Sequence, residues 1–355
     1  MLKSRINALL MGLLVLAAFT MMGCEGEEGP VGATGPAGEV GPTGATGVAG
    51  PAGADGADGA DGANGADGDL SQLTCTQCHN STNIITGKLA DWDQSAHGTG
   101  GSFLYAGGRG SCAGCHSGAS FSDMIANGEN WSNFSGGGDP QATRQDCRTC
   151  HQVHVTGTEA DWALTTSTAV ALEAVEGQTW DRGTSNLCVN CHQPRRIMDA
   201  ADADGNVTIT SSHWGPHYGA QSSMLLGVGG AIDGSPALHY TLVDNGCVTC
   251  HLGEGDEHSF VPTVAACTQC HSDAESFDIN GAVTEIGAMI DELGAGLVTA
   301  GLLDEEFHPI GGTVATEAQA AAVWNYRHIY QDHSHGVHNP AYTKALLTAG
   351  LEALQ

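Results

Sequence analysis

The sequence predicts a mainly α-helical protein with extensive irregular loops, and three observations support this fold class. Of the 355 residues, 52 are glycine and only 5% are aromatic, too few large side chains for an ordinary core of this size. Twelve of the 13 cysteines fall in short repeated motifs between residues 75 and 271. Apolar residues recur at helical spacing in the C-terminal part, which indicates helices there.

The charge balance excludes one class of partner. Acidic residues outnumber basic ones 40 to 11, and the formal net charge is −29. Binding to a nucleic-acid backbone requires a basic surface, so we expect no nucleic-acid partner. A strongly negative surface instead suits docking to cationic protein patches or to positively charged metal oxides.

Residues 1–23 have the features of a secretory signal peptide. Lys3 and Arg5 precede an apolar run that is too short to span a bilayer comfortably. The run ends in Met21-Met22-Gly23-Cys24, which resembles a bacterial lipobox with methionine where leucine is more usual. We expect lipidation of Cys24 rather than ordinary signal cleavage. This predicts an exported outer-membrane lipoprotein, attached through its lipid and facing either the cell surface or the periplasm.

A collagen-like period follows the lipobox, in residues 24–69. Every third residue from Gly26 to Gly68 is glycine, fifteen in all, which is the G-X-Y repeat. Between these two glycines stand four prolines and seven charged residues, all acidic, so three such chains would repel one another. An extended tether is therefore favoured, and a homotrimer through a triple helix is the alternative.

The repeated cysteine motif is C-x-x-C-H, and it occurs six times. Its cysteines and histidines are Cys75-Cys78-His79, Cys112-Cys115-His116, Cys147-Cys150-His151, Cys188-Cys191-His192, Cys247-Cys250-His251 and Cys267-Cys270-His271. Zinc sites or disulfides would explain paired cysteines but not a histidine after every second one. Covalent haem explains all three positions, because two thiols form thioethers and the histidine binds the iron as proximal ligand. The sequence thus predicts six covalently bound haem c groups.

Each iron also needs a ligand on its other face. Only four methionines follow the signal peptide, whereas the 17 histidines leave eleven outside the motifs, so histidine is expected on both sides of each iron. Seven of these histidines are distal candidates for six places: His97, His154, His213, His217, His239, His258 and His338. One of the seven is therefore surplus, and the choice at His213 and His217 is left open. We expect His308, His328, His333 and His335 to be surface or hydrogen-bonding residues.

The region after the last motif predicts helices. Val283, Ile286, Ile290, Leu293 and Leu297 step by three and four residues, which indicates a helix over 281–303 with a coiled-coil-like seam. A second helix is expected over about 314–332. A third begins at Asn339-Pro340, a capping residue followed by proline at the first helical position.

The predicted domain organisation has four parts: signal peptide 1–23, lipid-anchored tether 24–69, hexahaem domain 70–278, and C-terminal helices 279–355 that complete the haem domain. The motifs are too closely spaced for separate one-haem domains. The haems should therefore pack against one another and form much of the core, which explains the low aromatic content.

Residues 185–355 resemble the pentahaem cytochrome c nitrite reductase family. The shared features are His239, Cys247-Val-Thr-Cys-His251, His258, Cys267-Thr-Gln-Cys-His271 and His338 before a long helix. The resemblance implies haem ligation by these histidines and a homodimer through the long helices. That family's usual catalytic haem has lysine in place of the motif histidine, and all six motifs here end in histidine. A lipobox followed by G-X-Y repeats also looks like surface cytochromes of metal-reducing bacteria.

Two functions compete at this stage. In the first, a multihaem electron carrier exchanges electrons with other cytochromes or redox proteins, metal oxides or other extracellular acceptors, and it has no catalytic residue. A polymerising cytochrome filament is a variant of this hypothesis. In the second, one open haem reduces nitrite, hydroxylamine or a sulfur oxyanion. The shortage of positive charge disfavours an anion-reducing site, so electron transfer is the preferred interpretation.

Overall fold

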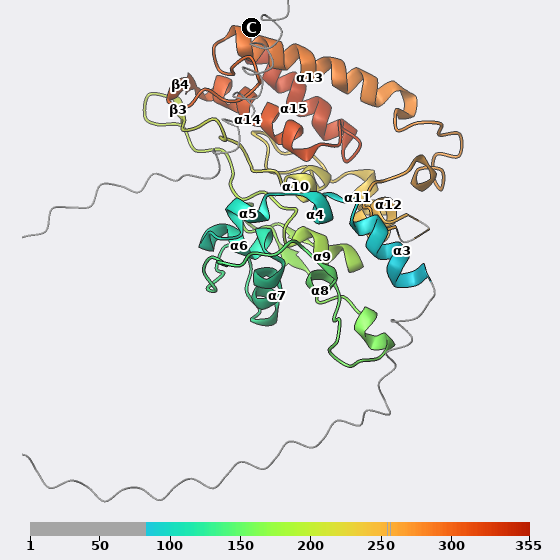
Figure 1. Ribbon diagram of the computed structural model, residues 1–355. Coiled ribbons are helices and arrows are strands. Elements are labelled where there is room, and N and C mark those ends of the chain that lie inside the picture. Colours follow the sequence, from blue (N-terminus) through green and yellow to red (C-terminus); the bar gives the residue numbers. More distant parts are fainter. Residues whose placement is uncertain (1–82, 254, 256) are drawn as a thin grey trace, which may run out of the picture. The chain divides into compact units, whose positions relative to one another are not determined.

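The computed structural model describes residues 83–253, 255 and 257–355, which form short helices joined by irregular loops (Figure 1). The signal peptide, Cys24, the G-X-Y segment and the first motif, Cys75-Cys78-His79, lie outside the described residues. The helices of the motif region are α3 (Asn83–Trp92), α4 (Ala96–Thr99), α5 (Phe103–Ala106), α6 (Gly110–His116), α7 (Gly118–Ala126), α8 (Cys147–Cys150), α9 (Asn186–Val189), α10 (Gln221–Leu226), α11 (Leu238–Leu242) and α12 (Cys247–His251). The fold class predicted from the sequence is confirmed.

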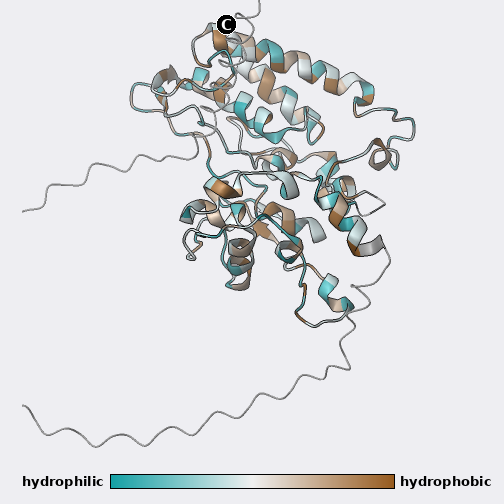
Figure 2. Cartoon of the chain, in the orientation of Figure 1, coloured by the Kyte–Doolittle hydropathy of each residue, from teal (hydrophilic) through white to brown (hydrophobic). Residues whose placement is uncertain are grey.

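Three longer helices, α13 (Ala282–Thr299), α14 (Glu317–Asp332) and α15 (Pro340–Glu352), pack together at one end of this region (Figure 1). Figure 2 shows apolar residues interleaved with polar ones along α13. The apolar seam is buried at Ile286, Leu293 and Leu297, as its spacing predicts. Gly350 lets α15 approach closely, because a Cβ there would lie 2.7 Å from Leu293 Cδ2.

Local sequence explains where these helices begin. Asn339 caps α15 by accepting a hydrogen bond from the Tyr342 amide, and Pro340 occupies the first turn, as predicted. Helix α14 begins at Glu317 rather than near 314, because Thr316 forms a capping box with Gln319. The residues just before it form a strand instead.

That strand, β4 (Thr313–Thr316), pairs antiparallel with β3 (Asn206–Ile209), whose position in the chain precedes the fifth motif. A second two-stranded sheet joins β1 (Val170–Ala171) to β2 (Thr179–Trp180). Trp214 and Met224, also from before the fifth motif, pack into the same core as α13 to α15. The boundary at 278/279 stays a prediction, and the chain contributes to the C-terminal core from both sides of it.

The largest core cluster centres on Trp324 of α14. Its ring is fully buried and meets Trp214 edge to face at 5.0 Å, and its indole N–H donates to the Gly229 carbonyl at 2.9 Å. Tyr342 and Asn339 bind the backbone of the same loop, at Ile232 and Ser235. No helix within the described part of the chain is long and apolar enough to cross a membrane.

Candidate haem-binding sites

The five described motifs lie on short helical turns. The second and fifth motifs lie within α6 and α12, and α8 contains both cysteines of the third. Helix α9 contains Cys188 of the fourth motif and ends before Cys191, and the sixth motif follows a 3-10 turn, Val264–Ala266. A spacing of three residues on a helical turn brings both cysteines to one side. Asp146 stabilises the α8 turn as a capping box with Thr149. None of the ten described motif cysteines forms a disulfide, which leaves their sulfur atoms available for thioether bonds.

Each described motif histidine faces one histidine from elsewhere in the chain. The ring centroids are separated by 6.1 Å for His116–His217, 6.1 Å for His151–His258, 6.2 Å for His192–His97, 6.3 Å for His251–His338 and 6.4 Å for His271–His239. All five facing residues belong to the seven distal candidates. The other two, His154 and His213, are exposed and lie outside these five pairs.

This separation fits a metal ion between two imidazoles. Imidazole binds zinc with a bond of about 2.0 Å, and a similar bond on each side of one iron would hold the two ring centres roughly 6.4 Å apart. Aromatic rings that pack directly on each other also have centroids about 4.5–7 Å apart, so one pair alone does not indicate a metal site. Five pairs, each joining one motif histidine to one other histidine, fit the expected axial ligands.

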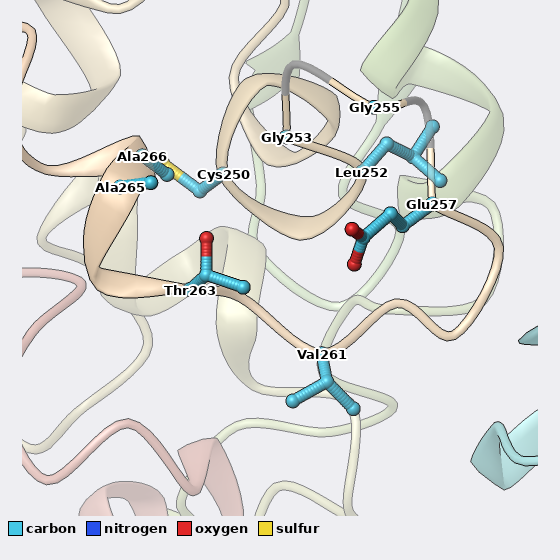
Figure 3. Close-up of a pocket in the computed structure, with 9 residues that line it drawn as sticks. All are labelled: Cys250, Leu252, Gly253, Gly255, Glu257, Val261, Thr263, Ala265 and Ala266. Carbon is cyan, nitrogen blue, oxygen red and sulfur yellow. The ribbon is translucent and has the colours of Figure 1, made fainter.

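The surroundings of the motifs suit a flat apolar group. Leu104 on α5, which packs on the helix of the second motif, is 76% exposed, and Leu238 and Leu242 on the helix of His239 are 72% and 73% exposed, so apolar surface is available on these helices. A cavity of 450 Å³ lies next to His151. A second cavity, of 160 Å³, opens beside Cys250, with Thr263 and Glu257 on its wall (Figure 3).

Hydrogen bonds hold many of these imidazoles in position. The Nδ1 atoms of His151, His239 and His251 lie 2.7–2.9 Å from the backbone carbonyls of Trp162, Val337 and Phe260. Nδ1 of His116 lies 3.3 Å from Ser102 Oγ, and Nδ1 of His192 lies 3.2 Å from Gln221 Oε1. An N–H donated from Nδ1 leaves Nε2 free to bind a metal.

His338 differs from these because its Nδ1 lies 2.6 Å from a carboxylate oxygen, Asp332 Oδ1. Burial acts to lower the pKa of His338, but the contact with Asp332 raises it above the ordinary value. By contrast, burial lowers the pKa of His97 and of His217 to about 4, which keeps both rings in the neutral, ligating form at neutral pH.

Contacts between motifs connect the sites. Cys115 of the second motif and Cys191 of the fourth lie close enough for each thiol to shift the pKa of the other, and the same holds for Cys188 of the fourth motif and Cys247 of the fifth. Cys250 of the fifth motif lies close enough to the sixth for both cysteines there to raise its thiol pKa, after the larger effect of burial.

The third motif joins the fourth through Phe260. The Phe260 ring lies 5.0 Å from that of His97 and 5.9 Å from that of His258. These two histidines face the fourth and third motifs. The fourth motif is thus the junction of the described sites.

Some residues at these sites were not foreseen. Asp332, Gln221, Ser102 and Phe260 belong to no motif, and spacing alone offers no signal for them. His328 is fully buried, so the surface alternative for it is wrong; its Nε2 lies 3.2 Å from Ser223 Oγ, which fits a hydrogen-bonding role.

Six C-x-x-C-H motifs, with each described motif histidine facing another histidine at the spacing of iron ligands, are the features expected of multihaem c-type cytochromes. Residues 64–152 match the family model of cytochrome c7 and related cytochrome c, and residues 21–72 match the collagen triple helix repeat.

Curated relatives agree with this class. The C-type polyheme cytochrome OmcB from two strains of Geobacter sulfurreducens is 27% identical over 287 residues, which cover 65% of this chain and 36% of the relative. The chain therefore spans about a third of the length of these relatives.

Two solved structures are similar. The outer cell wall cytochrome OcwA has a TM-score of 0.49 and 20% identity, covering 76% of this chain and 50% of that one. The undecaheme cytochrome from the S-layer of Carboxydothermus ferrireducens has a TM-score of 0.45 and 18% identity, covering 74% and 40%.

Proposed function

We propose that this chain is an electron carrier that holds six haem c groups, each with histidine on both faces of its iron. Haem iron supplies one-electron chemistry by alternating between its ferric and ferrous states. The observation that carries the proposal is the set of five histidine pairs with centroids 6.1–6.4 Å apart. In this assignment both faces of all five described sites are occupied, which favours electron transfer over a reductase with an open iron.

For the first motif, we propose that His154 or His213 ligates the iron opposite His79. Both are candidates outside the five pairs. The contacts between the motifs keep neighbouring sites close, so electrons can move between the second, fourth, fifth and sixth sites, with the third joined at the fourth.

We further propose that the chain is exported and lipidated at Cys24, and that the G-X-Y segment separates the haem region from the membrane. The net charge of −29 supports docking to cationic surfaces of other redox proteins or to metal oxides and similar extracellular acceptors. A trimer through the G-X-Y segment and a dimer through the C-terminal helices are the two forms of self-association to test.

The central test is the haem content and spin state of the purified oxidised protein. Pyridine haemochrome analysis should give six haems per chain, and electron paramagnetic resonance should show low-spin iron throughout. We also expect no turnover of nitrite or hydroxylamine. A different haem count, or a substantial high-spin signal with turnover, would overturn the proposal.

A single substitution tests whether His217, rather than His213, is the ligand opposite His116. His217→Ala should convert one haem of six to a high-spin form, because His116 loses the ring that faces it. His308→Ala, which removes a half-exposed histidine outside the pairs, is the matched control and should leave the spectrum unchanged. A fully low-spin His217→Ala protein would contradict the assignment.

A further inference from the structure

We propose that two charged side chains order the reduction potentials of the proposed haem sites: Asp332 lowers the potential at the fifth motif, and Arg195 raises it at the second. The inference rests on the proposed function, because it takes His251–His338 and His116–His217 as axial pairs. It concerns fixed charges beside these pairs.

Asp332 is 3% exposed and lies at the end of α14, where its Oδ1 contacts Nδ1 of His338 at 2.6 Å. The Ser334 hydroxyl donates to the other carboxylate oxygen, and the His338 amide donates to Ser334 Oγ at 3.3 Å. This arrangement fixes the carboxylate against the imidazole. A carboxylate that accepts the Nδ1 proton makes the ring a more electron-rich ligand, which stabilises ferric iron and lowers the potential.

The carboxylate acts on both rings of this pair. The rings of His251 and His338 lie 6.3 Å apart, so the carboxylate in contact with His338 also lies near the proximal ring. The Nδ1 contacts given above for the other sites are to backbone carbonyls, a hydroxyl or an amide, all of them neutral. Asp332 therefore distinguishes the fifth site from those.

Arg195 has the opposite charge and lies at the second site. Its Nη2 donates to the Ser111 carbonyl at 2.5 Å, next to the first cysteine of that motif. Its backbone amide donates to Pro216 at 3.0 Å, next to His217. Its guanidinium also lies over the Trp131 ring, 5.0 Å from the centroid. These contacts hold the backbone of Arg195 beside His217 and its permanently charged guanidinium beside the helix of the second motif.

The effect of Arg195 extends to both rings. The contacts with Ser111 and Pro216 place Arg195 beside both segments of this pair, so its positive charge disfavours added positive charge at the site. The same field favours ferrous over ferric iron, because reduction removes one positive charge from the site. Arg195 is half-buried, so solvent screens its charge more than that of Asp332.

Together these charges give the route a direction. The fifth site contacts the fourth through Cys247 and Cys188, and the fourth contacts the second through Cys191 and Cys115. With haem bound at both sites, one electron would pass from the site held by His251 and His338 to the site held by His116 and His217, with no proton transferred. Asp332 and Arg195 therefore make the transfer from the fifth to the second site favourable.

The test is a spectroelectrochemical titration of the full haem-loaded chain carrying Asp332→Asn or Arg195→Gln. In Asp332→Asn, the reduction potential of one low-potential step should rise by at least about 59 mV, which is a tenfold change in its one-electron equilibrium constant. Arg195→Gln should lower one high-potential step by a smaller amount. Asp332→Glu should shift the low step less than Asp332→Asn does. Asp304→Asn is the control. It removes a carboxylate beside His308, which belongs to none of the five histidine pairs, and should leave every reduction potential unchanged.

Ser334→Ala provides a second, independent variant if Asp332→Asn does not fold. Losing the hydroxyl donor strengthens the carboxylate as an acceptor from His338, so the low step should fall further. Unchanged potentials in correctly loaded, low-spin variants would overturn this inference and leave the proposed function standing. A wild-type chain without six low-spin haems would instead overturn the proposed function, and haem counts for every variant keep the two failures apart.

Discussion

Replacing Cys188 and Cys191 with alanine should remove the haem of the fourth motif and slow electron movement between the remaining sites by orders of magnitude. The fourth motif contacts the second through Cys191 and the fifth through Cys188, and Phe260 joins its facing histidine to the third site. Electron tunnelling falls steeply with distance, so loss of the junction interrupts every one of these connections.

Stopped-flow reduction by dithionite, followed by multi-exponential analysis of the haem absorbance, measures this effect. The same double substitution in the sixth motif, Cys267 and Cys270, is the matched control, because it also removes one haem but at the end of the route. We expect the remaining haems of the control to equilibrate almost as fast as in the wild type. Equal rates in both variants would exclude the fourth motif as the junction.

Trp324→Ala should lower the free energy of unfolding by about 3–5 kcal/mol, the range for removing a large aromatic side chain from a core. The indole is fully buried, packs edge to face on Trp214, and donates a hydrogen bond to Gly229. Its removal leaves a cavity and an unpaired carbonyl acceptor. Urea unfolding followed by far-ultraviolet circular dichroism measures the loss.

Two further variants keep this prediction specific. Trp324→Phe retains most of the ring but not the donor, so its loss of stability should be intermediate. Val314→Ala on β4, at a side chain 64% exposed, should change the stability by no more than about 0.5 kcal/mol. A Trp324→Ala protein as stable as the wild type would show that this cluster does not support the fold.

The features that could be predicted from the sequence are those set by residues close together in the chain. The haem motif can be recognised because thioether formation and proximal ligation need three residues within five positions. Periodic apolar residues predicted a helix over 281–303, observed as α13 (Ala282–Thr299), because burial on one side of a helix requires that spacing. Asn339-Pro340 likewise marked the first turn of α15, since capping is a local interaction.

Pairings between distant segments could not be predicted in this way. His97 faces the fourth motif rather than the nearer second, and His217 rather than His213 faces the second. The β3–β4 pair joins two short strands from separate parts of the chain, with no alternation long enough to detect. Nothing in the sequence distinguishes Asp332 from the other acidic residues. Its role depends on a contact with His338 that only the tertiary fold creates.

The order of the paired histidines along the chain also bears on how the protein is assembled. His338 follows all six motifs, whereas the motif histidine that it faces, His251, precedes the three long helices. Residues 252–338 must therefore be in place before this pair can close. Because α14 ends at Asp332 and α15 begins at Pro340, His338 lies in the short connection between them, so the closing of this pair is coupled to the packing of these two helices.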